Sequence, residues 1–154
     1  MMYRQTQDFL ADWNNAAKGA KKSIEAITEE KKTVAITEGH NSLEWLAWHL
    51  VEVGTTFGKW AGFNMPTPDE KPDTLIEIAK VYEDVAHVFE QQITDLQDAD
   101  LENMVPAFGS AMPLGNLLRI LITHQTHHVG QMTVLLRQAG LKVPPVMGPT
   151  KEMM

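Results

Sequence analysis

Residues 113–140 read PLGNLLRILITHQTHHVGQMTVLLRQAG, and the spacing of their apolar side chains predicts one long amphipathic helix. Pro113 suits the first helical turn, where its missing N–H group needs no partner. Gly140 suits the position after the last turn, because glycine readily adopts the left-handed conformation that ends a helix. The predicted apolar face contains Leu114, Leu117, Leu118, Leu121, Met132, Leu135 and Leu136.

Two histidines fall on this apolar face. On a helical wheel with about 100° per residue, His128 lies about 40° from His124, inside the stripe of leucines. Gln131 lies on the edge of the stripe and can hydrogen-bond an imidazole or a ligand. Either histidine alone could be a hydrogen-bonded core residue. Burying two bases is costly unless something satisfies them, and a metal ion shared at the i, i+4 spacing does so.

The motif HQTHH at 124–128 resembles the HExxH helix of zinc proteases. Gln125 stands where those enzymes have the glutamate that acts as general base, so protease chemistry is not expected. His127 points about 60° away from the apolar stripe and is left out of the predicted site.

A third histidine occupies the same kind of position on another predicted helix. His49 lies within the apolar stripe of that helix, as His124 and His128 do in theirs. Glu52 borders the stripe about one turn further on, where it can orient a ligand, serve as one or transfer a proton; the alternative is a surface carboxylate. Three core-facing imidazoles from two helices predict an open metal site, with positions left for water or substrate.

The helix that carries His49 is predicted to begin at Asn41 or Ser42 and to fade at 62–64. Asn41 and Glu44 have the spacing of a capping box. His40 precedes this helix and is expected to have a structural role, with lining the mouth of the site as the alternative.

Two further helices are predicted over 1–30 and over 74–96, the latter capped by Asp73. His87 lies opposite the apolar stripe of its helix and is expected on the surface. Residues 97–112 read as a loop, and no strand is predicted.

Four amphipathic helices predict an all-α fold, an up-down four-helix bundle with room for one long crossover. The length of 154 residues suits one domain over 1–154 that ends in a Pro-rich tail over 141–154. Val143, Val146 and Met147 give this tail apolar side chains with which to pack on the bundle. A di-iron carboxylate bundle does not fit, because no glutamate stands three residues before any of the three histidines.

Composition restricts the function further. The chain has no cysteine, which excludes disulfides, thiolate metal sites and a cysteine nucleophile. A net charge of −7 argues against a nucleic-acid partner. There is no apolar run long enough to span a membrane and no secretory signal, so a cytoplasmic location is expected.

The sequence resembles the DinB/YfiT-like family of metal-dependent four-helix bundle proteins. The resemblance covers almost the whole chain and is carried by four segments in the family's order. They are HNSLEWLAWHLVE at 40–52, H-x-x-x-H-x-G-Q at 124–131, LLRQAG at 135–140 and PPVMGP at 144–149. In that family three histidines hold the metal, and the positions that match are His49, His124 and His128.

The resemblance implies transfer of a low-molecular-weight thiol, such as bacillithiol, mycothiol or glutathione, or a related isomerase or hydrolase reaction. A metal held by neutral imidazoles makes a bound thiol or water nucleophilic near neutral pH. Three imidazoles suit several divalent ions. Of these we expect zinc or nickel, and iron and manganese are the alternatives. A metal- or ligand-binding protein without turnover, or a stress-response module, is the alternative function.

A homodimer is expected from large apolar side chains such as Trp48, which lies off the His49 stripe, and from the family resemblance.

Overall fold

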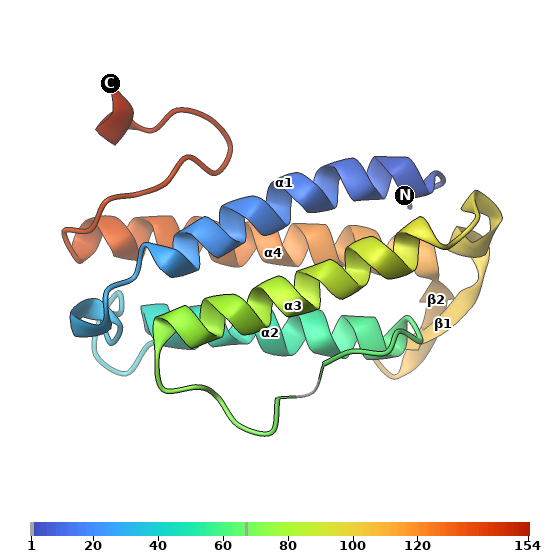
Figure 1. The fold of residues 1–154 in the computed structure, drawn as a ribbon, viewed down its shortest axis with the longest axis horizontal. Helices are drawn as coiled ribbons and strands as arrows, with labels where there is room; N and C mark the ends of the chain where they lie inside the picture. The colour runs from blue at the N-terminus through green and yellow to red at the C-terminus, as the bar shows by residue number, and fades with distance from the viewer. Residues whose placement is uncertain (1, 67) are drawn as a thin grey trace.

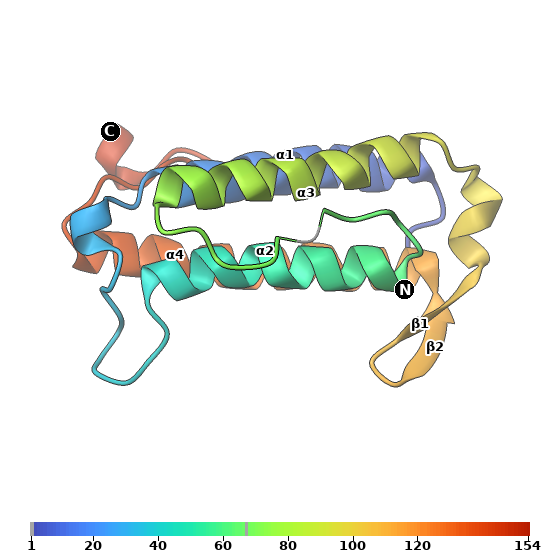
Figure 2. The ribbon, with the colours of Figure 1, turned by 60° about the horizontal axis from the view of Figure 1, so that its bottom comes forward.

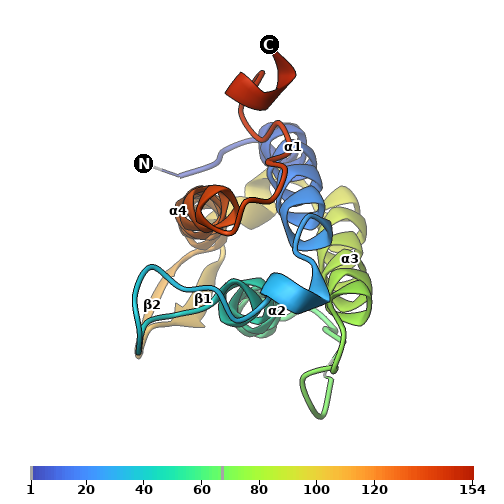
Figure 3. The ribbon, with the colours of Figure 1, turned by 90° about the vertical axis from the view of Figure 1, so that its left-hand side faces the viewer.

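The computed structural model describes residues 2–66 and 68–154 and confirms the predicted four-helix bundle (Figure 1). The four helices are α1 (Thr6–Glu25), α2 (Leu43–Trp60), α3 (Leu75–Thr94) and α4 (Leu114–Gln138). Both α1 and α2 pack against α3 and α4, so that α1 and α2 face each other across one diagonal of the bundle (Figure 3). The helix that carries His49 therefore lies beside the helix that carries the other two predicted ligands.

The chain reaches this arrangement through one long crossover. Figures 1 and 2 show α2 and α3 running in the same direction, opposite to α1 and α4, so the connection over 61–74 returns along the bundle. Phe63 and Met65 of this connection are buried, and the side chain of Met65 occupies the space that a side chain at Gly58 would fill. Residue 67 of this connection lies outside the described residues. The crossover places α2 antiparallel to α4, with their central turns side by side.

The first helix is shorter than the predicted 1–30 at both ends. Its first turn is capped from elsewhere in the chain, because the backbone N–H of Thr6 donates to Asp98 Oδ1 at 2.8 Å. Tyr3 lies before the helix and donates its backbone N–H to the carbonyl oxygen of Gly115 at 3.2 Å. The helix ends at Glu25, and residues Glu29–Lys31 form a separate 3-10 turn, η1.

The predicted caps of α2 and α3 are each displaced by one residue. Ser42, not Asn41, caps α2 by accepting the backbone N–H of Trp45 at 3.1 Å. Thr74, not Asp73, caps α3 and forms a capping box with Glu77. In both cases a hydroxyl oxygen satisfies a backbone N–H that the first helical turn leaves without a partner.

The prediction that 97–112 is a loop without strands is wrong. A 3-10 helix, η2 (Asp98–Glu102), is followed by the antiparallel hairpin of β1 (Met104–Ala107) and β2 (Ser110–Pro113). The hairpin leads directly into α4, so Pro113 is the cap residue and the helix begins one residue later than predicted. A short bridge also joins Ala35 to Ser42 in the loop before α2.

The end of α4 agrees with the prediction, and the tail that follows agrees with it only in part. Gly140 has a φ of 74°, as predicted for the residue that ends a helix in the left-handed conformation. In the tail, Val143 is buried and Val146 packs beside Gly19, whereas Met147 is exposed. Arg137 Nε donates to Glu152 Oε1 at 2.9 Å and fastens the end of the tail to α4.

Within the described parts of the chain, none of the helices combines the length and the hydropathy needed to cross a lipid bilayer.

We expect Gly115→Ala to destabilise the protein by about 1–3 kcal/mol, because a Cβ there would overlap the carbonyl oxygen of Tyr3. Gly130→Ala on the same helix is the matched control. A Cβ at Gly130 meets no described atom within 4 Å, so alanine should stabilise the helix by up to about 1 kcal/mol. Urea denaturation of the three proteins measures both effects, and equal stabilities of the two variants would contradict this account of the N-terminal segment.

Candidate metal centre

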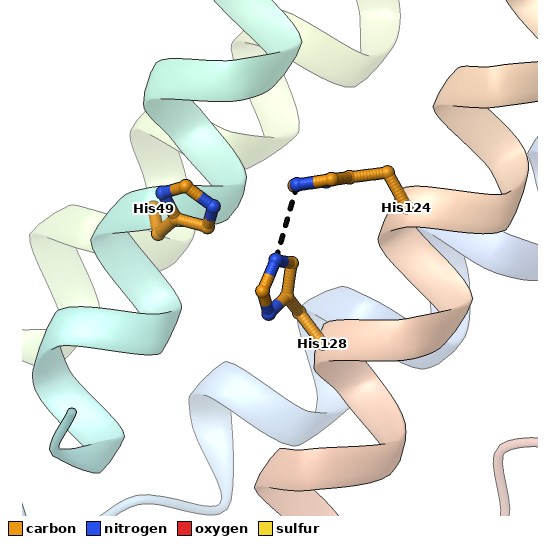
Figure 4. A group of neighbouring side chains, drawn as sticks. All are labelled: His49, His124 and His128. Atoms are coloured by element: carbon orange, nitrogen blue, oxygen red, sulfur yellow. Dashed lines mark hydrogen bonds between the residues drawn. The ribbon is translucent and has the colours of Figure 1, made fainter. Parts of the chain in front are cut away.

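Three imidazoles converge between α2 and α4 (Figure 4). His49 projects from α2, and His124 and His128 project from successive turns of α4. One ring nitrogen from each lies within 4.8 Å of the other two, and the Nε2 atoms of His124 and His128 are 3.1 Å apart. All three side chains are half-buried. The structure therefore brings together the three residues that the sequence selected.

Neighbouring side chains fix two of these rings. Gln131 Oε1 lies 2.7 Å from His128 Nδ1, so this nitrogen carries the hydrogen and donates it to the amide oxygen. The lone pair of neutral His128 is then on Nε2, the atom that faces His124. The indole of Trp45 stacks on the His49 ring, with centroids 4.5 Å apart and planes 16° apart. Gln131 was predicted to hydrogen-bond an imidazole or a ligand, and it lies at hydrogen-bond distance from the imidazole of His128.

The surroundings of the cluster keep its imidazoles neutral. Burial and, to a smaller extent, the neighbouring imidazoles together lower the pKa of His124 to about 4. Burial also lowers the pKa of His49 and of His128, although Glu52 opposes the shift at His49 and the hydrogen bond to Gln131 opposes it at His128. Neutral imidazoles present the lone pairs that a metal ion requires.

The other candidate residues lie at or outside the edge of the cluster. Glu52 is exposed, and among the described residues the group suited to a metal contains the three histidines and no carboxylate. His127 is exposed and contacts His128 only through its ring, with centroids 4.9 Å apart. His87 is on the surface, as predicted.

His40 lies on the loop before α2 and lines a cavity of about 310 Å³ that also includes Gln131. This cavity adjoins the hydrogen-bond partner of His128. His40 and the centre are thus related only through Gln131, and the role of His40 stays a prediction.

Gln125 faces away from the histidines. Its side chain is 1% exposed, and its Oε1 accepts the hydroxyl hydrogen of Tyr82 on α3 at 2.8 Å. A residue at this position therefore cannot act on a molecule bound at the imidazoles, which removes the analogy with the zinc proteases.

Two aromatic residues next to the cluster were not selected from the sequence. They are Trp45, which stacks on His49, and Phe57, whose ring centroid is 6.3 Å from that of His124. Helical spacing placed both near the apolar stripe of α2, where large aromatic residues usually serve the core. Trp45 differs from a core residue because 43% of it is exposed, and this exposure cannot be read from the sequence.

The donor set fits one transition-metal ion. Two neutral imidazoles that face each other at 3.1 Å can share only one hydrogen, whereas two nitrogens bound to the same ion at about 2.1 Å lie about 3.0–3.4 Å apart for bond angles between about 90° and 110°. The buried Nδ1 of His124 has no hydrogen-bond partner among the described residues. A cation would replace the hydrogen shared by His124 and His128 and would also be within reach of a ring nitrogen of His49, so the three residues can hold a metal ion.

Comparisons with known proteins show the family of this chain. The model of the DinB family matches residues 2–154. The chain belongs to the DinB family. The Bacillus subtilis protein YrdA is 37% identical over 155 residues, which cover 98% of this chain and 93% of YrdA.

Solved structures support the fold. A DinB-like protein from Bacillus cereus ATCC 10987 superposes with a TM-score of 0.86 at 36% identity, over 94% of this chain and 99% of that one. YfiT from Bacillus subtilis superposes with a TM-score of 0.70 at 13% identity, over 92% and 91% of the two chains. YfiT is described as a probable metal-dependent hydrolase with an unusual four-helix bundle topology. At this identity YfiT supports the four-helix bundle fold alone.

We expect one divalent metal ion per chain, and a sharp loss of occupancy in His49→Ala, His124→Ala and His128→Ala. The control is His87→Ala, because His87 is on the surface of α3, away from the cluster. Elemental analysis of protein prepared without an affinity tag measures the occupancy. Full occupancy in the His124→Ala protein would refute the assignment.

The metal-free protein should lose stability as the pH falls from about 6.5 to about 4. The pKa of His124 is lowered from 6.5 to about 4 in the folded state, so the unfolded chain binds more protons within this range. Denaturant titrations at several pH values measure the slope. His124→Asn should reduce it, and an unchanged slope in that variant would show that His124 is not the source.

Proposed function

We propose that the protein is a metal-dependent transferase that activates a low-molecular-weight thiol for attack on a small electrophile. The observation that carries this proposal is a half-buried group of three imidazoles that contains no fourth protein ligand among the described residues. Such a donor set leaves coordination positions for an exogenous molecule, as catalytic sites do and closed structural sites do not.

A metal ion bound by three neutral imidazoles would lower the pKa of a coordinated thiol or water, so that a nucleophile forms near neutral pH. The protein's own residues would arrange this chemistry. Gln131 holds the His128 ring with Nε2 toward the centre, and Trp45 holds the plane of His49. Glu52 is exposed one helical turn from His49 and can receive the proton that the nucleophile releases.

The composition of the chain supports an external thiol. Because the chain has no cysteine, the sulfur of a transfer reaction has to come from a second molecule. A cytoplasmic location suits this chemistry, since the reducing cytosol keeps small thiols in their free form. Zinc or nickel suits the three imidazoles, and the proposal does not depend on which of them is bound.

Hydrolysis is the second candidate, because the same centre can activate water and because YfiT is described as a probable metal-dependent hydrolase. A binding protein without turnover would use the same ligands. The transferase, the hydrolase and the binding protein differ in which molecule binds at the metal centre and in whether a product forms.

The test is to replace the metal with cobalt and to add bacillithiol, mycothiol or glutathione with a generic electrophile. We expect one thiol to change the cobalt spectrum and to be conjugated faster than in His128→Ala. Ester hydrolysis without any response to thiols would favour the hydrolase. No spectral change and no rate above that of the variant would leave a binding role.

A further inference from the structure

The turn that joins β1 and β2 holds a large aromatic residue in an unfavourable backbone conformation. Ala107 pairs with Ser110, so the loop contains only Phe108 and Gly109, with φ of 53° and 74°. Two-residue turns with positive φ at both positions strongly favour asparagine followed by glycine. Phenylalanine in the left-handed region is strained, and a conformation of this kind persists only where the surrounding structure holds it.

The strain is not explained by burial of the ring. Phe108 contacts Trp60 with centroids 4.7 Å apart and Phe57 with centroids 5.6 Å apart, yet its side chain remains 56% exposed. A phenylalanine that served only the core would be covered. Phe57, Trp60 and Phe108, here called the aromatic wall, instead present a partly open apolar surface.

The aromatic wall adjoins His124 through Phe57. The ring of Phe57 is buried between the exposed part of the wall and the centre, with its centroid 6.3 Å from that of His124. Phe108 is therefore two ring contacts away from a candidate metal ligand. Figures 2 and 3 show the hairpin and the loop before α2 projecting on the same side of the α2–α4 pair, at opposite ends of it. The hairpin thus brings Phe108 to the side of the bundle on which α2 and α4 meet.

We infer that the aromatic wall is a binding subsite for the aromatic part of a small molecule whose metal-binding atom sits at the three histidines. This inference rests on the proposed function, because it assigns a substrate class to the same centre. An aromatic ring can pack edge-to-face or offset against Trp60 and Phe108, and Phe57 links this partly covered surface to His124. Phe108 is on this account a residue that determines specificity.

The experiment compares ligands that differ only in the aromatic group. Phenylalkanethiols with two to four methylenes and alkanethiols of the same chain length are titrated into the cobalt-loaded protein, and their dissociation constants are measured from the cobalt spectrum. Phenyl and methyl hydroxamates form a second pair, which binds divalent metals through oxygen. We expect the phenyl member to bind more tightly, and Phe108→Asn to reduce that preference about three- to tenfold.

The choice of asparagine separates binding from folding. Asparagine suits the turn better than phenylalanine, so Phe108→Asn should keep or raise the melting temperature while it loses selectivity. Ile76→Asn is the matched control, because Ile76 is 83% exposed at the start of α3 and is not part of the wall. That variant should keep the full preference for phenyl ligands.

Each outcome is informative about a different claim. If thiols bind but the preference is the same in Phe108→Asn, the subsite is refuted and the proposed function stands. If only hydroxamates bind and Phe108→Asn loses the preference among them, the subsite stands and thiol transfer is refuted. If Phe108→Asn converts a dimer into a monomer by light scattering and leaves the preference unchanged, the wall is a contact between two copies and the subsite is refuted. If neither ligand class binds, both proposals fail.

Discussion

The antiparallel contact between α2 and α4 is the constraint on which the candidate centre depends. His124 and His128 lie one turn apart on α4, and His49 must face the space between them from α2. The crossover over 61–74 allows this, because it carries the chain back along the bundle and leaves α2 beside α4. A displacement of α2 by one turn would move His49 by about 5 Å and would separate it from the other rings.

This contact places three imidazoles at positions where a four-helix bundle normally buries apolar side chains. Burial lowers the pKa of all three imidazoles, neighbouring imidazoles add to this lowering, and Gln131 and Trp45 hold two of the rings in place. A cation shared by the rings would be coordinated by the ring nitrogens that lie close together. Gln125, which follows His124 on this turn, is directed to Tyr82 in the core, so this face of α4 is not part of the centre.

The surroundings of the centre follow from segments that sequence patterns describe poorly. The hairpin was missed because its strands are four residues long, one contains Pro106, and its turn has phenylalanine where asparagine would indicate a hairpin. The start of α1 was placed too early because its cap is Asp98, which lies 92 positions along the chain. The tail was only partly anticipated, since Val143 and Val146 pack on the bundle and Met147 does not.

The sequence by itself determined the four helices and the inward direction of His49, His124 and His128, because helical periodicity is a local property in which every third or fourth residue shares a face. Only the tertiary structure decided which faces meet. It placed α2 against α4, brought the nitrogens of His124 and His128 to 3.1 Å, and set Phe108 beside Phe57. Such distances depend on packing between segments far apart in the chain, and no local pattern encodes that packing.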